Sequence, residues 1–172
     1  LKVVAPKVVL DAKLSGGTVA GKRQSAGLDA LAAVSKLGIG AADNTLIQKS
    51  PIEFGSALFQ SASLGNFTVT RNAPTESLPE GTALPERGRV SASQLNDSGF
   101  GSVTIASNDN IAIENGADLK LPQQGTLKLL AAGSDGIDLG GHIDIVGGTV
   151  SVQTMGRNTA AAAKTPSGTV VL

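Results

Sequence analysis

Short strands that recur at a fixed spacing are the feature that most limits how this sequence can fold. Three alternating apolar runs begin about eight residues apart: Val103-Thr104-Ile105, Ile111-Ala112-Ile113 and Leu119-Lys120-Leu121. The same apolar pairs recur further along the chain, as Leu127/Leu129 and then Val150/Val152, as Ile137/Leu139, and as Ile143/Ile145. Each step is about 24 residues, a period typical of solenoid proteins, and each period contains three strands.

The alternation within each run indicates which kind of solenoid this is. Apolar residues stand at i and i+2, so one face of each strand is buried and the other meets solvent. Strands this short are not stable alone, but stacked coils would pair them in parallel at about 4.8 Å and align their side chains in columns. We therefore predict an all-β chain, a right-handed three-sided parallel β-helix (solenoid) with a loop or short-helix insertion. A β-sandwich also has many short strands, but its loops would less readily keep three strands per period.

The composition fits thin, tightly turned layers better than a thick core. Only four phenylalanines and no Trp or Tyr accompany 22 glycines, so Val, Ile, Leu and Ala must build the interior. The absence of cysteine excludes disulfides and cysteine-ligated metal sites. Fourteen basic and 14 acidic residues cancel, which argues against nucleic acid or an anionic membrane as the main partner.

We expect residues 1–172 to be one segment of a longer β-helix. The chain begins at Leu1 without a signal peptide and ends in the apolar run Val170-Val171-Leu172, as an excerpt from a longer polypeptide would. No apolar run approaches the roughly 18 residues of a transmembrane segment. Further strands are expected at Leu1-Lys2-Val3, Val8-Val9-Leu10, Thr45-Leu46-Ile47, Ile52-Glu53-Phe54 and Phe67-Thr68-Val69.

Two interruptions of the solenoid are predicted. Residues 22–44 form an insertion with a short helix over Ser25 to Leu37, where apolar residues fall at helical spacing and Gly38 ends the run. Residues 71–98 form a proline-rich surface loop, because proline lacks the donor that a sheet ladder needs. Its prolines are Pro74, Pro79 and Pro85.

Three acidic residues are candidates for a catalytic or metal site. Asp109, Asp135 and Asp138 are the candidates for the calcium-binding cluster of a polysaccharide lyase, but they fall at corners where aspartate is favoured for turns, and no arginine stands at a matching position nearby. The stretch from Gly133 to Asp138 is similar to one imperfect copy of a calcium-binding glycine-aspartate repeat, which binds calcium only between stacked copies.

The single histidine, His142, is a candidate metal ligand or catalytic base. With no cysteine and no second histidine, either role needs a neighbour such as Asp144, which lies two residues along the same strand face. A solvated corner histidine is the simpler interpretation. We predict no catalytic, cofactor-binding or metal-ligating residue, and no enzyme activity.

Residues 90–154 resemble the filamentous-haemagglutinin-related exoproteins of Gram-negative two-partner secretion, in a region towards the C-terminal side of their long β-helices. The resemblance is carried by Ser98-Gly99-Phe100-Gly101-Ser102 leading into an alternating strand, by the I-x-I and L-x-L runs that follow, and by an earlier echo from Leu1 to Ala12. It implies a secreted or surface-exposed shaft that acts in adhesion or haemagglutination. The alternative is a carbohydrate-binding or polysaccharide-lyase-type β-helix.

The same resemblance implies the partners. The parent chain would cross an outer-membrane two-partner-secretion transporter unfolded and then fold at the cell surface, where its loops could contact a host-cell receptor or glycan. The Asn-Pro-Asn motifs of the family's secretion domain are absent here. This segment is therefore not expected to contact the transporter as the secretion signal.

Overall fold

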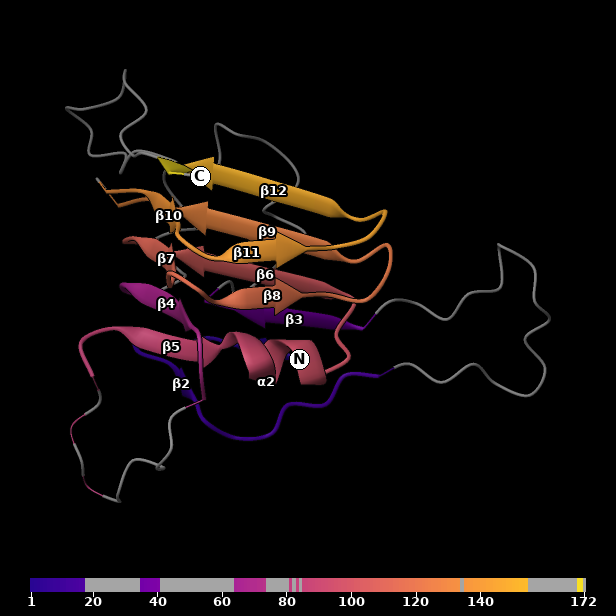
Figure 1. Cartoon of the computed structure of the whole chain (residues 1–172). Coiled ribbons are helices and arrows are strands. Elements are labelled where there is room, and N and C mark those ends of the chain that lie inside the picture. Colours follow the sequence, from indigo (N-terminus) through magenta and orange to yellow (C-terminus); the bar gives the residue numbers. More distant parts are fainter. Residues whose placement is uncertain are drawn as a thin grey trace.

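The computed structural model describes residues 1–17, 35–40, 64–73, 81, 83, 85–133, 135–154 and 170–171. This part of the chain consists mostly of strands in three sheets (Figure 1). The first sheet contains, in spatial order, β1 (Lys2–Val3), β3 (Lys36–Ile39), β6 (Ser102–Ser107), β9 (Thr126–Ala131) and β12 (Thr149–Thr154). The second contains β13 (Val170–Val171), β10 (Ile137–Leu139), β7 (Ile111–Ile113), β4 (Phe67–Thr70), β5 (Gly88–Ser91) and β2 (Val9–Leu10). The third contains β11 (His142–Asp144) and β8 (Asp118–Lys120).

The strand register confirms the repeat predicted from the sequence. Val103 pairs with Leu127 and Leu127 with Val150 in the first sheet. In the other two sheets, Ile111 pairs with Ile137 and Leu119 with Ile143. Every strand pair among the described residues is parallel, so the expected all-β class with parallel sheets is confirmed. The strands β6, β7 and β8 enter the three sheets in turn, and β9, β10 and β11 repeat that order.

The core is made of apolar columns that run across the sheets. Leu37, Val103 and Leu127 are aligned on β3, β6 and β9, and each is fully buried. The neighbouring column of Ile39, Ile105 and Leu129 is equally buried. Because burying one such side chain contributes about 1.5–3 kcal/mol, contacts between successive strands supply much of the stability.

An asparagine ladder holds the corner that precedes the second sheet. Asn110 Nδ2 donates to Asn66 Oδ1 at 3.2 Å, and Asn110 Oδ1 accepts from the backbone N–H groups of Asp135 and Gly136, both at 3.0 Å. Asn66, Asn110 and Gly136 are the residues immediately before β4, β7 and β10. One side chain therefore joins three levels of the corner.

The end of the predicted insertion over 22–44 needs correction. Lys36–Ile39 is strand β3, in which Leu37 and Ile39 are buried. The triplet Leu37-Gly38-Ile39 follows the two-residue alternation of a strand, and pairing with β1 and β6 outweighs the helical spacing of the residues before it. Residues 18–34 and 41–63 lie outside the described residues. The part of the predicted helix from Ser25 to residue 34 therefore stays a prediction.

The loop predicted over 71–98 also ends too late. Gly88–Ser91 is strand β5, and Ala92–Asp97 is helix α2. Val90, Ala92 and Leu95 of these elements are buried. The prolines stop at Pro85, and the segment beyond it begins with an alternating strand and then a helix that has its own N-cap, Ser91. Residues 74–80, 82 and 84 lie outside the described residues.

The position of β5 interrupts the regular winding. Strand β5 follows β4 in the chain but lies on its N-terminal side, between β4 and β2. The chain then enters α2, which lies beside β8 at the edge of the third sheet, before it returns to the first sheet as β6 (Figure 1). The helix therefore occupies the place where another strand of the third sheet would lie.

Candidate functional site

The outward face of the third sheet carries the main charged cluster that the described residues form. In β8 and β11 the middle residues, Leu119 and Ile143, face inward, so the residues on either side of them face solvent. The parallel register places His142 beside Asp118, and Asp144 beside Lys120. The result is two rows of polar side chains one strand apart.

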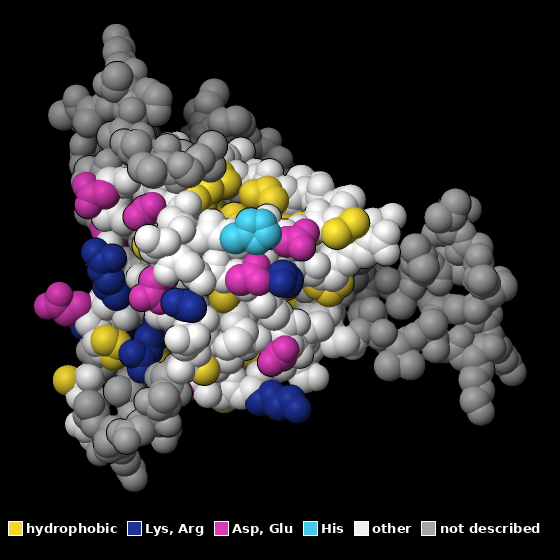
Figure 2. Space-filling view, viewed as in Figure 1, with side chains coloured by type: hydrophobic (Ala, Val, Ile, Leu, Met, Phe, Trp, Pro, Cys, Tyr) yellow, Lys and Arg dark blue, Asp and Glu magenta, His cyan; other side chains and the backbone are white. Residues whose placement is uncertain are grey.

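Asp118 is the centre of this cluster. Its Oδ2 lies 2.7 Å from Lys120 Nζ, and its Oδ1 lies 3.1 Å from His142 Nδ1. Figure 2 shows the imidazole of His142, the only histidine, next to acidic and basic groups on an open surface. The His142 side chain is 72% exposed, so it is not enclosed in a cavity.

The opposite charges in this cluster stabilise each other's ionised forms. The hydrogen bond from Lys120 lowers the pKa of Asp118 below its ordinary value, and the hydrogen bond from His142 lowers it further. The same contact with Asp118 raises the pKa of Lys120. Both groups therefore stay ionised over a wider pH range than they would alone. Because the cluster is exposed, salt will screen these interactions.

Helix α2 completes the inner edge of the cluster through one side chain. Asn96 Nδ2 donates to the carbonyl oxygen of Asp118 at 2.8 Å, and Asn96 Oδ1 accepts from the backbone N–H of Lys120 at 2.7 Å. A neighbouring parallel strand would satisfy the same two backbone groups. The amide of Asn96 thus takes the place of a strand at this edge.

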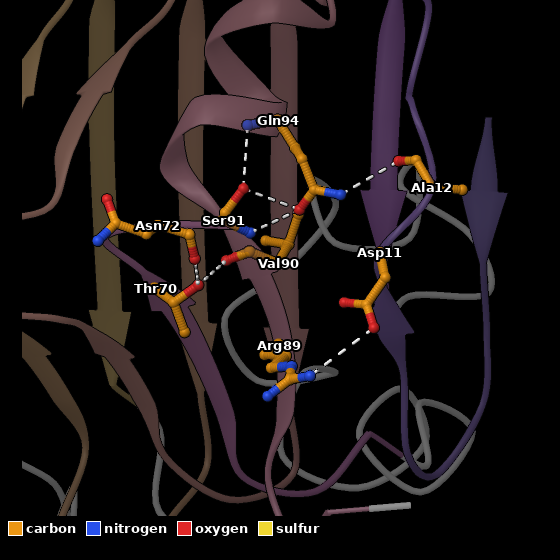
Figure 3. A network of polar contacts seen from close by, with 8 residues as sticks. All are labelled: Asp11, Ala12, Thr70, Asn72, Arg89, Val90, Ser91 and Gln94. Atoms are coloured by element: carbon orange, nitrogen blue, oxygen red, sulfur yellow. Dashed lines mark hydrogen bonds and ion pairs between the residues drawn. The ribbon is translucent and has the colours of Figure 1, made fainter. Parts of the chain in front are cut away.

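The helix is itself fixed by a polar network at its N-terminus (Figure 3). Ser91 Oγ accepts from the backbone N–H of Gln94 at 3.1 Å, and Gln94 Oε1 accepts from the backbone N–H of Ser91 at 3.0 Å, which is a capping box. Gln94 Nε2 also donates to the carbonyl oxygen of Ala12 at 3.2 Å. Nearby, Arg89 and Asp11 form an ion pair at 3.7 Å between β5 and the segment after β2.

The three aspartates that the sequence offers as candidates lie in two successive corners and on β10. Asp109 lies in the corner after β6, and Asp135 lies in the next corner beside the asparagine ladder, where its Oδ2 accepts from Asn110. Asp138 is exposed on β10, opposite Ala112. Of the stretch from Gly133 to Asp138, Ser134 lies outside the described residues. Among the described residues, no group of three or more His, Cys, Asp and Glu side chains is placed to hold a metal ion.

His142 and Asp144 do lie on the same strand face, as expected, but the contact of His142 is with Asp118. Sequence reasoning did not single out Asp118. The signal was present in the repeat, because Asp118 and His142 each precede an apolar residue of the same column, Leu119 and Ile143.

Searches against protein-family models, curated proteins and solved structures each found no match. Within the described part of the chain, no helix has the length and hydrophobicity needed to cross a membrane.

Proposed function

We propose that this chain is a shaft segment of a large secreted or surface-exposed exoprotein of a Gram-negative bacterium, acting in adhesion or haemagglutination. In this proposal its architecture is a right-handed three-sided parallel β-helix. The observation that carries the proposal is the register: residues one period apart are paired in parallel in each of the three sheets. Such stacking suits a long, thin support because each coil contacts only its neighbours.

The chemistry of the chain supports export followed by folding outside the cell. A chain that crosses an outer-membrane transporter unfolded benefits from having no cysteine that could pair early, and this sequence has none. A solenoid can then fold progressively, because its contacts are with adjacent coils. The transporter is a partner of the parent chain in this proposal, and a host-cell receptor or glycan is the partner of its exposed loops.

The outward face of the third sheet fits a supporting role. Asp118, Lys120 and His142 satisfy one another in a row of short polar contacts on an open surface. The contact between Asp118 and His142 joins β8 to β11 and supports their register, which is what a shaft requires. We therefore propose that the residues that bind a partner lie in the loops.

The test compares the intact chain with a variant in which residues 74–84 are replaced by a Gly-Ser linker of equal length. These limits spare β4 and β5, which flank the segment. Circular dichroism establishes that both proteins keep a β spectrum, and binding to host cells and to a glycan array is then measured. If the body of the chain is only a shaft, the variant should not bind, whether or not the intact chain binds.

Two outcomes would count against the shaft. Binding that survives replacement of residues 74–84 would show that the body of the chain is itself a binding module. Depolymerisation of an acidic polysaccharide by the intact chain would favour the lyase alternative. A matched variant, Asp138→Asn, would then report whether the acidic residue on β10 takes part.

A further inference from the structure

The turn that joins β7 to β8 contains the one Asn-Gly step of the sequence, Asn115-Gly116. The Ala117 N–H donates to the Glu114 carbonyl oxygen at 2.9 Å, so Asn115 and Gly116 are the two central residues of a β-turn. Gly116 has a φ of 76°, which is the left-handed conformation that the third residue of a type II turn adopts. Both central residues are exposed. The turn therefore presents this dipeptide to water.

This turn is longer than the equivalent turn of the next coil. Four residues, 114–117, separate β7 from β8, whereas two residues, 140 and 141, separate β10 from β11. Because the strands on either side are paired in register, the extra residues project from the stack. Coil-to-coil hydrogen bonds of 3.0 and 2.8 Å to the carbonyl oxygens of Ile113 and Ala117 continue the ladder on both sides of them. The two central residues of the turn therefore lie outside the ladder.

The backbone N–H of Gly116 differs from those that follow other asparagines of the stack. In three residues that directly follow an asparagine, the N–H group is held in a hydrogen bond of 2.9–3.1 Å: Phe67, Asp109 and Ile111. Among the described residues, none accepts from the Gly116 N–H. Glycine also has no Cβ that could obstruct the approach to its nitrogen. The nitrogen of Gly116 is therefore accessible to the side chain that precedes it.

We propose that Asn115 is a site of spontaneous deamidation, in which the Gly116 nitrogen closes a cyclic imide on the Asn115 side chain. The nucleophile and the amide that it attacks belong to the same turn, so the reaction is intramolecular and avoids the entropic cost of bringing two molecules together. The proposal is carried by the geometry of this turn. It goes beyond the proposed shaft function and does not depend on it.

Water is the only co-reactant that the modification needs. Hydroxide removes the proton from the Gly116 nitrogen, which then bonds to Cγ of Asn115 while the Cγ–Nδ2 bond breaks. Nδ2 takes a proton from water and leaves as ammonia. Water then opens the imide at either of its two carbonyl groups, which gives aspartate or isoaspartate. The sum of these steps consumes one water and releases one ammonia, with no oxidation or reduction.

The product carries a new negative charge close to Arg71. A Cβ placed on Gly116 would lie 3.7 Å from Nη1 of Arg71, so the guanidinium is next to the turn. The Arg71 backbone N–H also donates to Oε2 of Glu114 at 2.7 Å. The Arg71 side chain therefore offsets part of the repulsion between the new carboxylate and Glu114. Because the central residues of the turn lie outside the ladder, the extra backbone methylene of isoaspartate should leave the flanking strands paired.

The test incubates the intact chain in neutral and in mildly alkaline buffer and follows its charge by isoelectric focusing. The sequence has a formal net charge of zero, so deamidation gives an acidic species with one additional negative charge. We expect this species to form faster at the higher pH, because the imide closes from the deprotonated nitrogen. Peptide mapping by mass spectrometry should place both aspartate and isoaspartate at position 115.

Three variants separate this site from the rest of the chain. Asn115→Gln is expected to abolish the acidic species, because the longer side chain closes a less favourable ring. The matched control is Asn72→Gln, since Asn72 is also exposed but precedes alanine, and it should leave the rate unchanged. Asn115→Asp should accumulate isoaspartate without releasing ammonia, because it reaches the same imide by loss of water. Circular dichroism should show that the deamidated chain keeps its β spectrum.

Three results would overturn the proposal. One is an intact chain whose charge does not change, or changes no faster than that of Asn115→Gln. Another is peptide mapping that places the charge change at a different asparagine. The third is loss of the β spectrum on deamidation, which would show that the turn is needed to hold the ladder.

Discussion

The side chain of Asn96 is hydrogen-bonded to the backbone of Asp118 and Lys120 on β8, as the backbone of a neighbouring strand would be. It accepts from the Lys120 N–H at 2.7 Å and donates to the Asp118 carbonyl oxygen at 2.8 Å. Replacing it with alanine removes two hydrogen bonds worth about 0.5–1.5 kcal/mol each. We expect Asn96→Ala to lower the free energy of unfolding by about 1–3 kcal/mol in urea titrations. Asp97→Ala, on the exposed side of the same helix, is the control and should change it by less than about 0.5 kcal/mol.

The capping box of α2 gives a second prediction. Ser91→Ala removes the hydroxyl that accepts from the Gln94 N–H, and a lost N-cap typically costs about 0.5–2 kcal/mol. Gln94→Ala should cost more than a cap alone, because it also removes the hydrogen bond to Ala12. Thermal unfolding of both single variants and the double variant measures their coupling. Strictly additive effects would show that the two side chains do not act as a box.

The asparagine ladder gives a third prediction. Asn110→Ala removes the side-chain acceptor of the exposed Asp135 N–H and one of the two acceptors of the Gly136 N–H, which also donates to the Gly133 carbonyl oxygen at 3.2 Å. Each lost hydrogen bond contributes about 0.5–1.5 kcal/mol. We expect a loss of that order in the free energy of unfolding. Asn115→Ala, an exposed asparagine in the following turn, is the comparison. Equal losses from the two variants would mean that the ladder does not hold the corner.

The charged cluster predicts a specific pH dependence. The pKa of Asp118 is lowered in the folded state by Lys120 first and His142 second, so its contribution is present above the ordinary aspartate pKa of 3.8 and is lost as the pH falls through the folded value. The pKa of Lys120 is raised from 10.5 by Asp118, so its contribution is present below 10.5 and is lost as the pH rises through the folded value. Asp118→Asn should weaken both dependences. An NMR titration in which the Asp118 carboxyl midpoint lies at or above 3.8 would contradict this account.

Gln124 and Gly147 occupy the same position in two successive turns, and exchanging glycine at this position should change stability in opposite directions. Gln124 has a φ of 60° in the turn before β9, and Gly147 has a φ of 65° in the turn before β12. A side chain in this left-handed region costs about 1 kcal/mol. We expect Gln124→Gly to be neutral or slightly stabilising and Gly147→Ala to lower the unfolding free energy by about 1 kcal/mol. A marked loss from Gln124→Gly would indicate that the Gln124 side chain has a role of its own.

Much of the fold could be predicted from the sequence because it is local and periodic. Runs such as Ile111-Ala112-Ile113 carry their own two-residue alternation, and the recurrence at about 24 residues identifies their partners. The place of β5 could not be predicted, because its pairing with β2 and β4 depends on which edges are free in the folded chain. The substitution of Asn96 for a strand is likewise set by where α2 packs. The contact of Asp118 with His142 follows from register alone and could have been found by aligning the repeats.

The most direct measurement of the central claim inserts whole periods into the chain. If the coils stack as a β-helix, four extra copies of Thr126–Gly148 placed after Gly148 keep every strand in its own sheet and lengthen the molecule by about 19 Å, at about 4.8 Å per strand. Small-angle scattering should record that increase, together with an unchanged β spectrum and cooperative unfolding. The matched control inserts a single extra copy of residues 126–137, about half a period, at the same place and should disrupt folding. Unfolding of the whole-period variant, or equal tolerance of both insertions, would contradict the coil-by-coil account.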